Sequence, residues 1–235
     1  MMKKLIFGCF LALAATTLFL SSCGKNDGYE SANPYANYFY PWDTTMKVYL
    51  YRDVANGLDE QFQRVYCVKD QAGRHIVVEV YSADGRIIEA MNFNTDSLDV
   101  MDHMVVDRNG KKTKAEVFKY SFFPMGKNQE SYFASRFSGF LDSTLILREV
   151  KKKYLKEIKD YEVLGEKKPA LVTRDHIRMT NFNPFSKKET SLESDATFYY
   201  AEGYGLTEWH DDNKKVHYKL EKIMTQDEWI KIITR

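Results

Sequence analysis

The fold is decided by the stretch KDQAGRHIVVEVYSADGRIIEAMNF, which runs from Lys69 to Phe93. Turn signals at Gly73 and at Asp84-Gly85 enclose a run in which aliphatic residues recur at every second position. Glycine, alone or after Asp, adopts the positive φ that tight hairpin turns require. This stretch therefore predicts antiparallel strands joined by short hairpins.

The alternation inside this run predicts which face of the sheet is buried. Every second residue from Ile76 to Val80 is aliphatic, whereas the intervening set contains Val77, Glu79 and then Tyr81. Successive side chains on a strand point to opposite faces. We therefore expect the face that begins at Ile76 to be the more apolar one.

The hairpin pattern continues in both directions along the chain. Asn109-Gly110 is a further turn signal, residues 197–223 are typical of a closing hairpin, and Val48–Tyr51 is typical of a strand. The composition is 14% aromatic, which also favours strands. We predict a mainly β fold, an antiparallel curled sheet that forms a half-barrel-like β-meander with at most one or two short helices.

Residues 144–165 fit two kinds of secondary structure. Val150, Tyr154 and Ile158 are spaced like the face of a helix, whereas Thr144–Leu147 is typical of a strand. We favour long, bent strands that end at Gly165, and a helix is the alternative.

The remaining C-terminal segments predict one strand, one loop and one helix. Residues 170–179 are typical of a strand, and residues 180–196 are predicted to be a polar loop that carries Pro184. Thr225 and Glu228 have the spacing of a capping box, which predicts a short terminal helix packed on the sheet.

The N-terminal segment has the three parts of a secretory signal peptide. Lys3 and Lys4 precede an uncharged apolar run, which ends in FLSSCGKND. Leu20 to Cys23 resembles the lipobox of bacterial lipoproteins. That resemblance implies cleavage before Cys23, attachment of a diacylglycerol to its thiol, and acylation, such as by palmitate, of the new amino group. A plain secreted protein with a cysteine at the cleavage junction is the alternative.

The lipobox resemblance also implies where the protein resides. Gly24 follows Cys23, and the aspartate that often retains lipoproteins at the inner membrane is absent from that position. We therefore expect an envelope protein anchored in the outer membrane by its acyl chains, in a leaflet that the sequence leaves open. The expected division is a signal peptide over residues 1–22, a flexible tether over 23–37, and a single antiparallel β-sheet domain over 38–235.

The two ends of the predicted domain resemble uncharacterised secreted bacterial lipoproteins. YFYPWDTTMKVYLYRD, residues 38–53, is similar to their aromatic-proline opening, and residues 198–223 are similar to their closing strand pair. The resemblance implies a sheet curled into a half-barrel, in some members like that of lipoprotein carriers. The glycine-centred hairpins show a weaker resemblance to MORN-like repeats.

Charge and cysteine content exclude several classes of function. Without Lys3 and Lys4, 32 of the 34 basic side chains remain beside 33 acidic ones, which gives a net charge of −1. No basic field is left to attract nucleic acid, so we expect no nucleic-acid partner. Cys67 is the one cysteine besides Cys9 in the signal and Cys23, so we expect no intramolecular disulfide and interpret Cys67 as a small core residue.

Histidines beside acids are the candidates for metal binding or catalysis. His210-Asp211-Asp212 could form a metal site with His217 on the next strand, but Asp-Asp-Asn is also an ordinary turn sequence, which we favour. Asp102-His103 and Asp175-His176 are neighbours on strands, so the two side chains of each pair should point apart. The charge run in residues 148–160 is interpreted as a solvated face, with binding of anionic headgroups as the alternative.

The sequence therefore favours binding over catalysis. It holds no nucleophile elbow, no paired-cysteine motif and no phosphate loop. We expect no enzymatic activity, no catalytic residue, no metal and no cofactor. The expected role is a binding or interaction module of the cell envelope, with an envelope protein or an apolar ligand as partner. The alternatives are a lipid or lipoprotein carrier or acceptor with an apolar groove lined by Tyr and Phe, and, less favoured, an envelope hydrolase.

Overall fold

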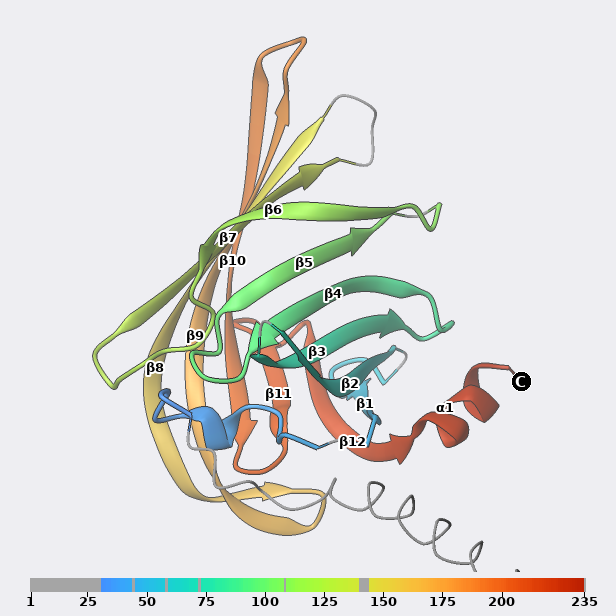
Figure 1. The fold of residues 1–235 in the computed structure, drawn as a ribbon, viewed down its shortest axis with the longest axis vertical. Coiled ribbons are helices and arrows are strands. Elements are labelled where there is room, and N and C mark those ends of the chain that lie inside the picture. The colour runs from blue at the N-terminus through green and yellow to red at the C-terminus, as the bar shows by residue number, and fades with distance from the viewer. Residues whose placement is uncertain are drawn as a thin grey trace, which may run out of the picture.

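The computed structural model describes residues 31–43, 45–57, 59–71, 73–107, 109–139 and 144–234. These residues form an antiparallel β-barrel of twelve strands, which is closed where β1 pairs with β12 (Figure 1). Its strands are β1 Lys47–Asp53, β2 Glu60–Asp70, β3 Gly73–Ser82, β4 Ile87–Asn94, β5 Val100–Val106, β6 Lys112–Tyr120, β7 Glu130–Ser138, β8 Leu145–Val163, β9 Glu166–Asn183, β10 Lys188–Ala201, β11 Gly205–Asp211 and β12 His217–Thr225. Two helices accompany them, the 3-10 turn η1 Ala36–Tyr38 and the α-helix α1 Gln226–Ile233.

The mainly β, antiparallel curled sheet predicted from the sequence is confirmed, and the sheet curls until its edges meet. The predicted turn glycines Gly73, Gly85 and Gly110 have φ values of 118°, 75° and 79°. Side chains other than glycine rarely adopt such values, so these positions fix the hairpins. None of the helices among the described residues is long and apolar enough to pass through a membrane.

The ambiguous segment over residues 144–165 is a strand, as favoured. β8 pairs with β7 on one side and with β9 on the other, and its turn lies at Leu164 and Gly165. A step of four residues also keeps Val150 and Tyr154 on one face of a strand, and a bulge after Tyr154 then shifts the register before Ile158. Hydrogen bonding to two neighbouring strands decides between the two patterns.

The prediction of a polar loop over residues 180–196 is wrong. β9 continues to Asn183, β10 begins at Lys188, and only the turn that contains Pro184 separates them. The hairpin projects beyond the rest of the barrel (Figure 1), and residues 188–194 of β10 are exposed. A strand exposed on both faces needs no apolar face, and residues 188–194 are polar except for Leu192, so the alternation that identifies a strand is missing.

The last part of the predicted tether packs against the barrel. Asn33 and Tyr35 are buried, and Tyr35 stacks on Tyr154 of β8 at 5.9 Å. The Asn33 N–H donates to Asp96 O at 3.0 Å. We call residues 31–42 the plug segment. The predicted signal peptide, the predicted lipid-attachment residue Cys23 and residues 24–30 lie outside the described residues.

The plug segment covers one end of the barrel. It contacts the turn between β4 and β5, and it also accepts a hydrogen bond from Gly203 N, between β10 and β11, on Asn37 O. Because successive turns of a meander alternate between its two ends, the turn between β3 and β4 lies at the opposite end. The plug therefore defines a closed end of the barrel.

A second hydrophobic cluster lies outside the barrel wall, beneath α1. We call it the outer cluster; its members are Val48, Leu50, Phe62, Tyr81, Met224 and Trp229. Val48 and Leu50 of β1 point outward into it, whereas Tyr49 and Tyr51 belong to the interior cluster. The predicted capping box is confirmed, because the Thr225 side chain accepts from Glu228 N and the Glu228 carboxylate accepts from Thr225 N.

Candidate ligand-binding cavity

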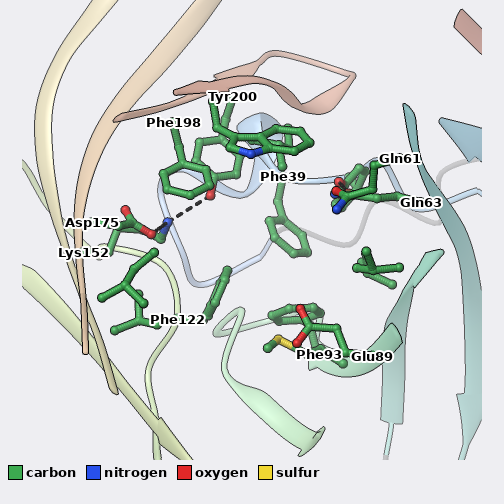
Figure 2. A pocket seen from close by; sticks show the side chains of 18 of the residues that line it. Phe39, Gln61, Gln63, Glu89, Phe93, Phe122, Lys152, Asp175, Phe198 and Tyr200 are labelled. Carbon is green, nitrogen blue, oxygen red and sulfur yellow. Dashed lines mark hydrogen bonds and ion pairs between the residues drawn. The ribbon is translucent and has the colours of Figure 1, made fainter. Parts of the chain in front are cut away.

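The barrel interior contains a cavity of about 210 Å³. Side chains from both sides of the barrel and from the plug segment line it, and they form an aromatic surface broken by a few polar groups (Figure 2). Phe39 of the plug packs edge-on against Phe93 at 5.0 Å and against Phe123 at 5.7 Å. The plug therefore supplies an aromatic floor at the closed end.

Close approach of the backbone fixes the position of Tyr40 beside this floor. Gly205 has a φ of 82°, and a Cβ added there would lie 2.5 Å from a carbon of the Tyr40 ring. The Tyr40 hydroxyl donates to Gln63 Oε1 and lies 3.3 Å from the Tyr51 hydroxyl. Glycine at position 205 thus admits a ring that connects the plug to β2.

Lys152 and Asp175 form an ion pair on the cavity wall. Lys152 Nζ donates to Asp175 Oδ2 at 2.6 Å and to the Tyr200 hydroxyl at 2.9 Å. The Thr173 hydroxyl donates to the other carboxylate oxygen at 3.2 Å. The Lys152 side chain is 1% exposed and that of Asp175 3%. Both charges are therefore removed from water and partnered.

Three aromatic rings surround the Lys152 ammonium. Their centroids lie 4.8 Å away for Phe198, 5.0 Å for Phe122 and 5.1 Å for Tyr200. A cation over the face of a ring is attracted by the ring quadrupole. These contacts hold the rings against the ion pair, and Figure 2 shows the group on one side of the cavity.

Burial shifts the pKa values of this group. Desolvation lowers the pKa of Lys152 and raises the pKa of Asp175, and the attraction between the two charges opposes both shifts. Desolvation also raises the pKa of Tyr200 well above its usual value, and the neighbouring Asp175 adds to this. The Tyr200 hydroxyl therefore stays protonated.

Arg148 and Glu89 form a second ion pair in the cavity. Arg148 Nη1 donates to Glu89 Oε2 at 2.6 Å, and His103 Nε2 lies 3.5 Å from the same oxygen. Burial raises the pKa of Glu89, but the Arg148 charge and the nearby His103 outweigh it and lower the value to about 2. His103 is held by a 2.9 Å contact between its Nδ1 and the Ser135 hydroxyl. Glu89 is therefore ionised at neutral pH.

Glutamine side chains occupy the side of the cavity formed by β2. Gln61 and Gln63 lie across from Lys152 and Asp175 in Figure 2. Gln63 Nε2 lies 3.4 Å from Gln61 Oε1. Gln61 and Glu89 both lie near turns at the end opposite the plug, whereas Gln63 is bonded to Tyr40 of the plug itself. An amphipathic molecule in the cavity would therefore meet hydrogen-bonding groups interspersed among apolar walls.

The sequence interpretation missed the two interior cations. It treated residues 148–160 as a solvated face, which holds for Lys151 and Lys153 but is wrong for Arg148 and Lys152. Val150 was the signal that could have identified them. On a strand, residues two before and two after an inward aliphatic side chain share its face, and here these residues are Arg148 and Lys152.

The predicted divergence of neighbouring acids and histidines is confirmed. Asp175 lies in the cavity, whereas His176 is half-exposed and its Nδ1 lies 3.0 Å from Asp195. His103 is buried, whereas Asp102 pairs with Lys114 at the surface. Neither pair forms an acid–base dyad.

The favoured turn interpretation of Asp211 and Asp212 is also supported. Residues 212–216 connect β11 to β12, and Asp211 Oδ1 accepts from Val216 N at 3.2 Å. His210 and His217 are cross-strand partners whose rings lie 5.4 Å apart. His217 Nε2 lies 2.7 Å from Glu208 Oε1. Although these three side chains lie near one another, the part of the chain that the structure describes has no group of three or more His, Cys, Asp or Glu placed to hold a metal ion.

Cys67 lies at the edge of the interior cluster, as its interpretation as a core residue expected. Its Sγ accepts a hydrogen bond from Asp43 N at 3.3 Å. Burial raises the pKa of the Cys67 thiol, which disfavours the reactive thiolate.

Comparison with known proteins finds distant structural neighbours. No protein-family model and no curated protein matches the chain. A Parabacteroides distasonis protein described as a "putative lipoprotein" is 11% identical, with a TM-score of 0.47 over 83% of this chain and 100% of that chain. A Bacteroides fragilis "putative exported protein with YmcC-like fold" is 13% identical, with a TM-score of 0.35 over 80% of this chain and 99% of that chain. Both descriptions concern export or lipid attachment, and the resemblance to MORN-like repeats finds no support.

Proposed function

We propose that this chain is a non-enzymatic envelope lipoprotein whose barrel binds a small amphipathic molecule in its interior. The carrying observation is the cavity, which has aromatic walls interrupted by a few hydrogen-bonded polar groups. Ligand sites in proteins are typically concave and mostly apolar, with a few convergent polar groups that orient the ligand. Acyl chains on Cys23 would hold the protein at the outer membrane while the barrel binds its ligand.

The cavity volume favours a small ligand. An apolar cavity of about 150 Å³ can hold one benzene molecule, and this cavity measures about 210 Å³. A molecule with one ring or a short chain and a polar group fits that space. The alternative of a carrier for whole lipids would need a larger cavity, so a carrier role is favoured only for single short chains.

Native mass spectrometry of residues 24–235, purified gently, tests this proposal. We expect a discrete added mass that organic solvent releases. If the protein emerges without a ligand, a thermal-shift screen against small amphipathic molecules follows. A bare mass together with no stabilisation by any of them would overturn the proposal and favour a protein-interaction role.

A matched pair of variants localises the binding. Val80 lines the cavity, whereas Val77 lies on the opposite face of the same strand. Val80→Phe would fill part of the cavity and should abolish the added mass or the stabilisation. Val77→Phe adds the same ring on the other face and should leave both unchanged.

A further inference from the structure

The charges that line the cavity sum to zero. Among the described lining residues, four side chains are charged, and they form two ion pairs. Arg148 contacts Glu89 at 2.6 Å, and Lys152 contacts Asp175 at 2.6 Å. Each charge thus has its counter-charge within hydrogen-bonding distance.

Further polar contacts complete the Lys152–Asp175 pair, and in the other pair His103 Nε2 lies 3.5 Å from Glu89 Oε2. Asp175 also accepts from the Thr173 hydroxyl, and Lys152 also donates to the Tyr200 hydroxyl. A charged ligand would therefore meet no unpaired counter-charge, and it would lose its hydration on entering. Removing an ion from water without compensation costs several kcal/mol.

Hydrogen-bonding capacity for an uncharged group is present. Gln61 Oε1 lies 3.4 Å from Gln63 Nε2, and the Gln61 amide N–H groups point to no acceptor among the described contacts. Arg148 carries five N–H donors, and one of its nitrogens, Nη1, donates to Glu89. An uncharged oxygen, such as a hydroxyl or a carbonyl, could accept from these donors without adding charge.

From this we infer that the cavity selects ligands with an uncharged hydrogen-bond acceptor and rejects ligands with a carboxylate or an ammonium group. The inference rests on the proposed function and defines the chemical class of its ligand. Selection arises from the balance of the two ion pairs, so any change that unbalances one of them changes the preference.

A ligand series of constant size tests the selection. Phenylethanol, phenylacetate and phenylethylamine share one ring and a short linker, and at neutral pH they are neutral, anionic and cationic. Binding to the mature chain is measured by calorimetry or ligand-observed NMR. We expect phenylethanol to bind at least about tenfold more tightly than either charged probe, which corresponds to about 1.4 kcal/mol.

The outcomes separate the two proposals. Binding of none of the three probes, together with a bare native mass, overturns the proposed function. Equal or tighter binding of a charged probe overturns the selection but leaves the binding role in place.

Two variants, each of which removes one charge of the Arg148–Glu89 pair, test whether the charge balance sets this preference. Glu89→Gln leaves Arg148 without its counter-charge and should shift the preference about tenfold toward phenylacetate. Arg148→Gln leaves Glu89 unpaired and should shift it toward phenylethylamine. Both side chains are about one-fifth exposed, at 22% and 23%, so folding should tolerate either change.

The matched control is a buried carboxylate on the outer face of the barrel wall. Glu79 pairs with Arg64 there and does not line the cavity. Glu79→Gln removes the same charge and should leave the order of the three probes unchanged. If all three variants behave alike, the charge balance in the cavity does not set the preference, and the inference is wrong.

Discussion

The two sides of strand β1 differ in how they use burial. On the outside, the outer cluster is apolar apart from the Tyr81 hydroxyl, which donates to Glu79 at 2.9 Å, and the Trp229 indole N–H, which has no partner among the described residues. On the inside, the barrel holds two ion pairs and two glutamines around a cavity. The outer side is filled and has one ion pair at its margin, between Arg64 and Glu79, whereas the inner side keeps empty space and two ion pairs.

This difference separates what stabilises the fold from what serves binding. Buried ion pairs often stabilise a protein no more than well-packed apolar side chains of similar volume would. The outer cluster shows that this chain can fill a space with apolar groups. Under the proposed function, the charges and the empty volume of the interior would serve ligand binding, and the outer cluster would serve stability.

Trp229→Ala should have the largest effect on stability. The Trp229 ring packs against Tyr81 at 4.8 Å and Phe62 at 6.1 Å, and it is 3% exposed. Truncating a buried Trp should lower the free energy of unfolding by about 3–5 kcal/mol. Urea denaturation measures the loss, and probe binding at low denaturant should be retained.

Trp229→Phe is the control for this prediction. It keeps an aromatic ring in the outer cluster and removes an indole N–H that lacks a partner, so the loss should be clearly smaller. If the two variants lose the same stability, packing of this ring does not hold α1 on the barrel.

Replacing the Lys152–Asp175 pair by apolar residues should have the next largest effect on stability. Unlike Trp229→Ala, this change should not destabilise the protein. Lys152→Met combined with Asp175→Leu should leave stability unchanged or raise it by about 1–4 kcal/mol. The net charge of the cavity stays zero, so phenylethanol should remain the preferred probe. Chemical denaturation and the probe series measure the two effects.

The single variant Lys152→Met is the control for the pair. It leaves the Asp175 carboxylate buried without a partner, so it should destabilise the protein by about 3–5 kcal/mol. If the double variant is as unstable as the single one, the ion pair contributes to the fold itself, and the division between the two sides fails.

The pH dependence of stability tests the charges on the inner side of the barrel. The expected effect is smaller than those of the preceding variants. The pKa of Glu89 is lowered to about 2 in the folded protein, so its ionised form stabilises the fold at any pH above its unfolded value of about 4.3. This contribution should be lost as the pH falls from about 4.3 toward 2. We expect about 1–3 kcal/mol from this group.

Acid unfolding of Glu89→Gln checks the assignment. The variant should lack this part of the pH dependence between pH 2 and 5, as followed by circular dichroism at fixed urea concentrations. If the variant loses stability between pH 2 and 5 as the unchanged protein does, another carboxylate is responsible for the pH dependence.

Local signals in the sequence predicted much of the fold. Gly73, Gly85 and Gly110 marked hairpins because few other residues accept their backbone geometry, and Thr225 with Glu228 marked the start of α1. Closure of the barrel could not be read in the same way, because β1 and β12 lie far apart in the chain and their pairing has no local signature.

The cavity was harder to predict than the fold. Its four charged residues come from β4, β8 and β9, and the register of those strands decides which of them meet. Arg148 and Lys152 were hidden in a lysine-rich run whose alternate residues do face solvent. Only the alternation around Val150 distinguishes the two sets.

The pairing of β1 with β12 also bears on the kinetics of folding. Lys47 pairs with Thr225, so the barrel closes only when nearly the whole chain is available. Contacts between residues so distant in sequence slow folding, typically to milliseconds or seconds. A chain that becomes available progressively from its N-terminus would therefore remain an open sheet until its last strand arrives, and only then would the interior cavity be enclosed.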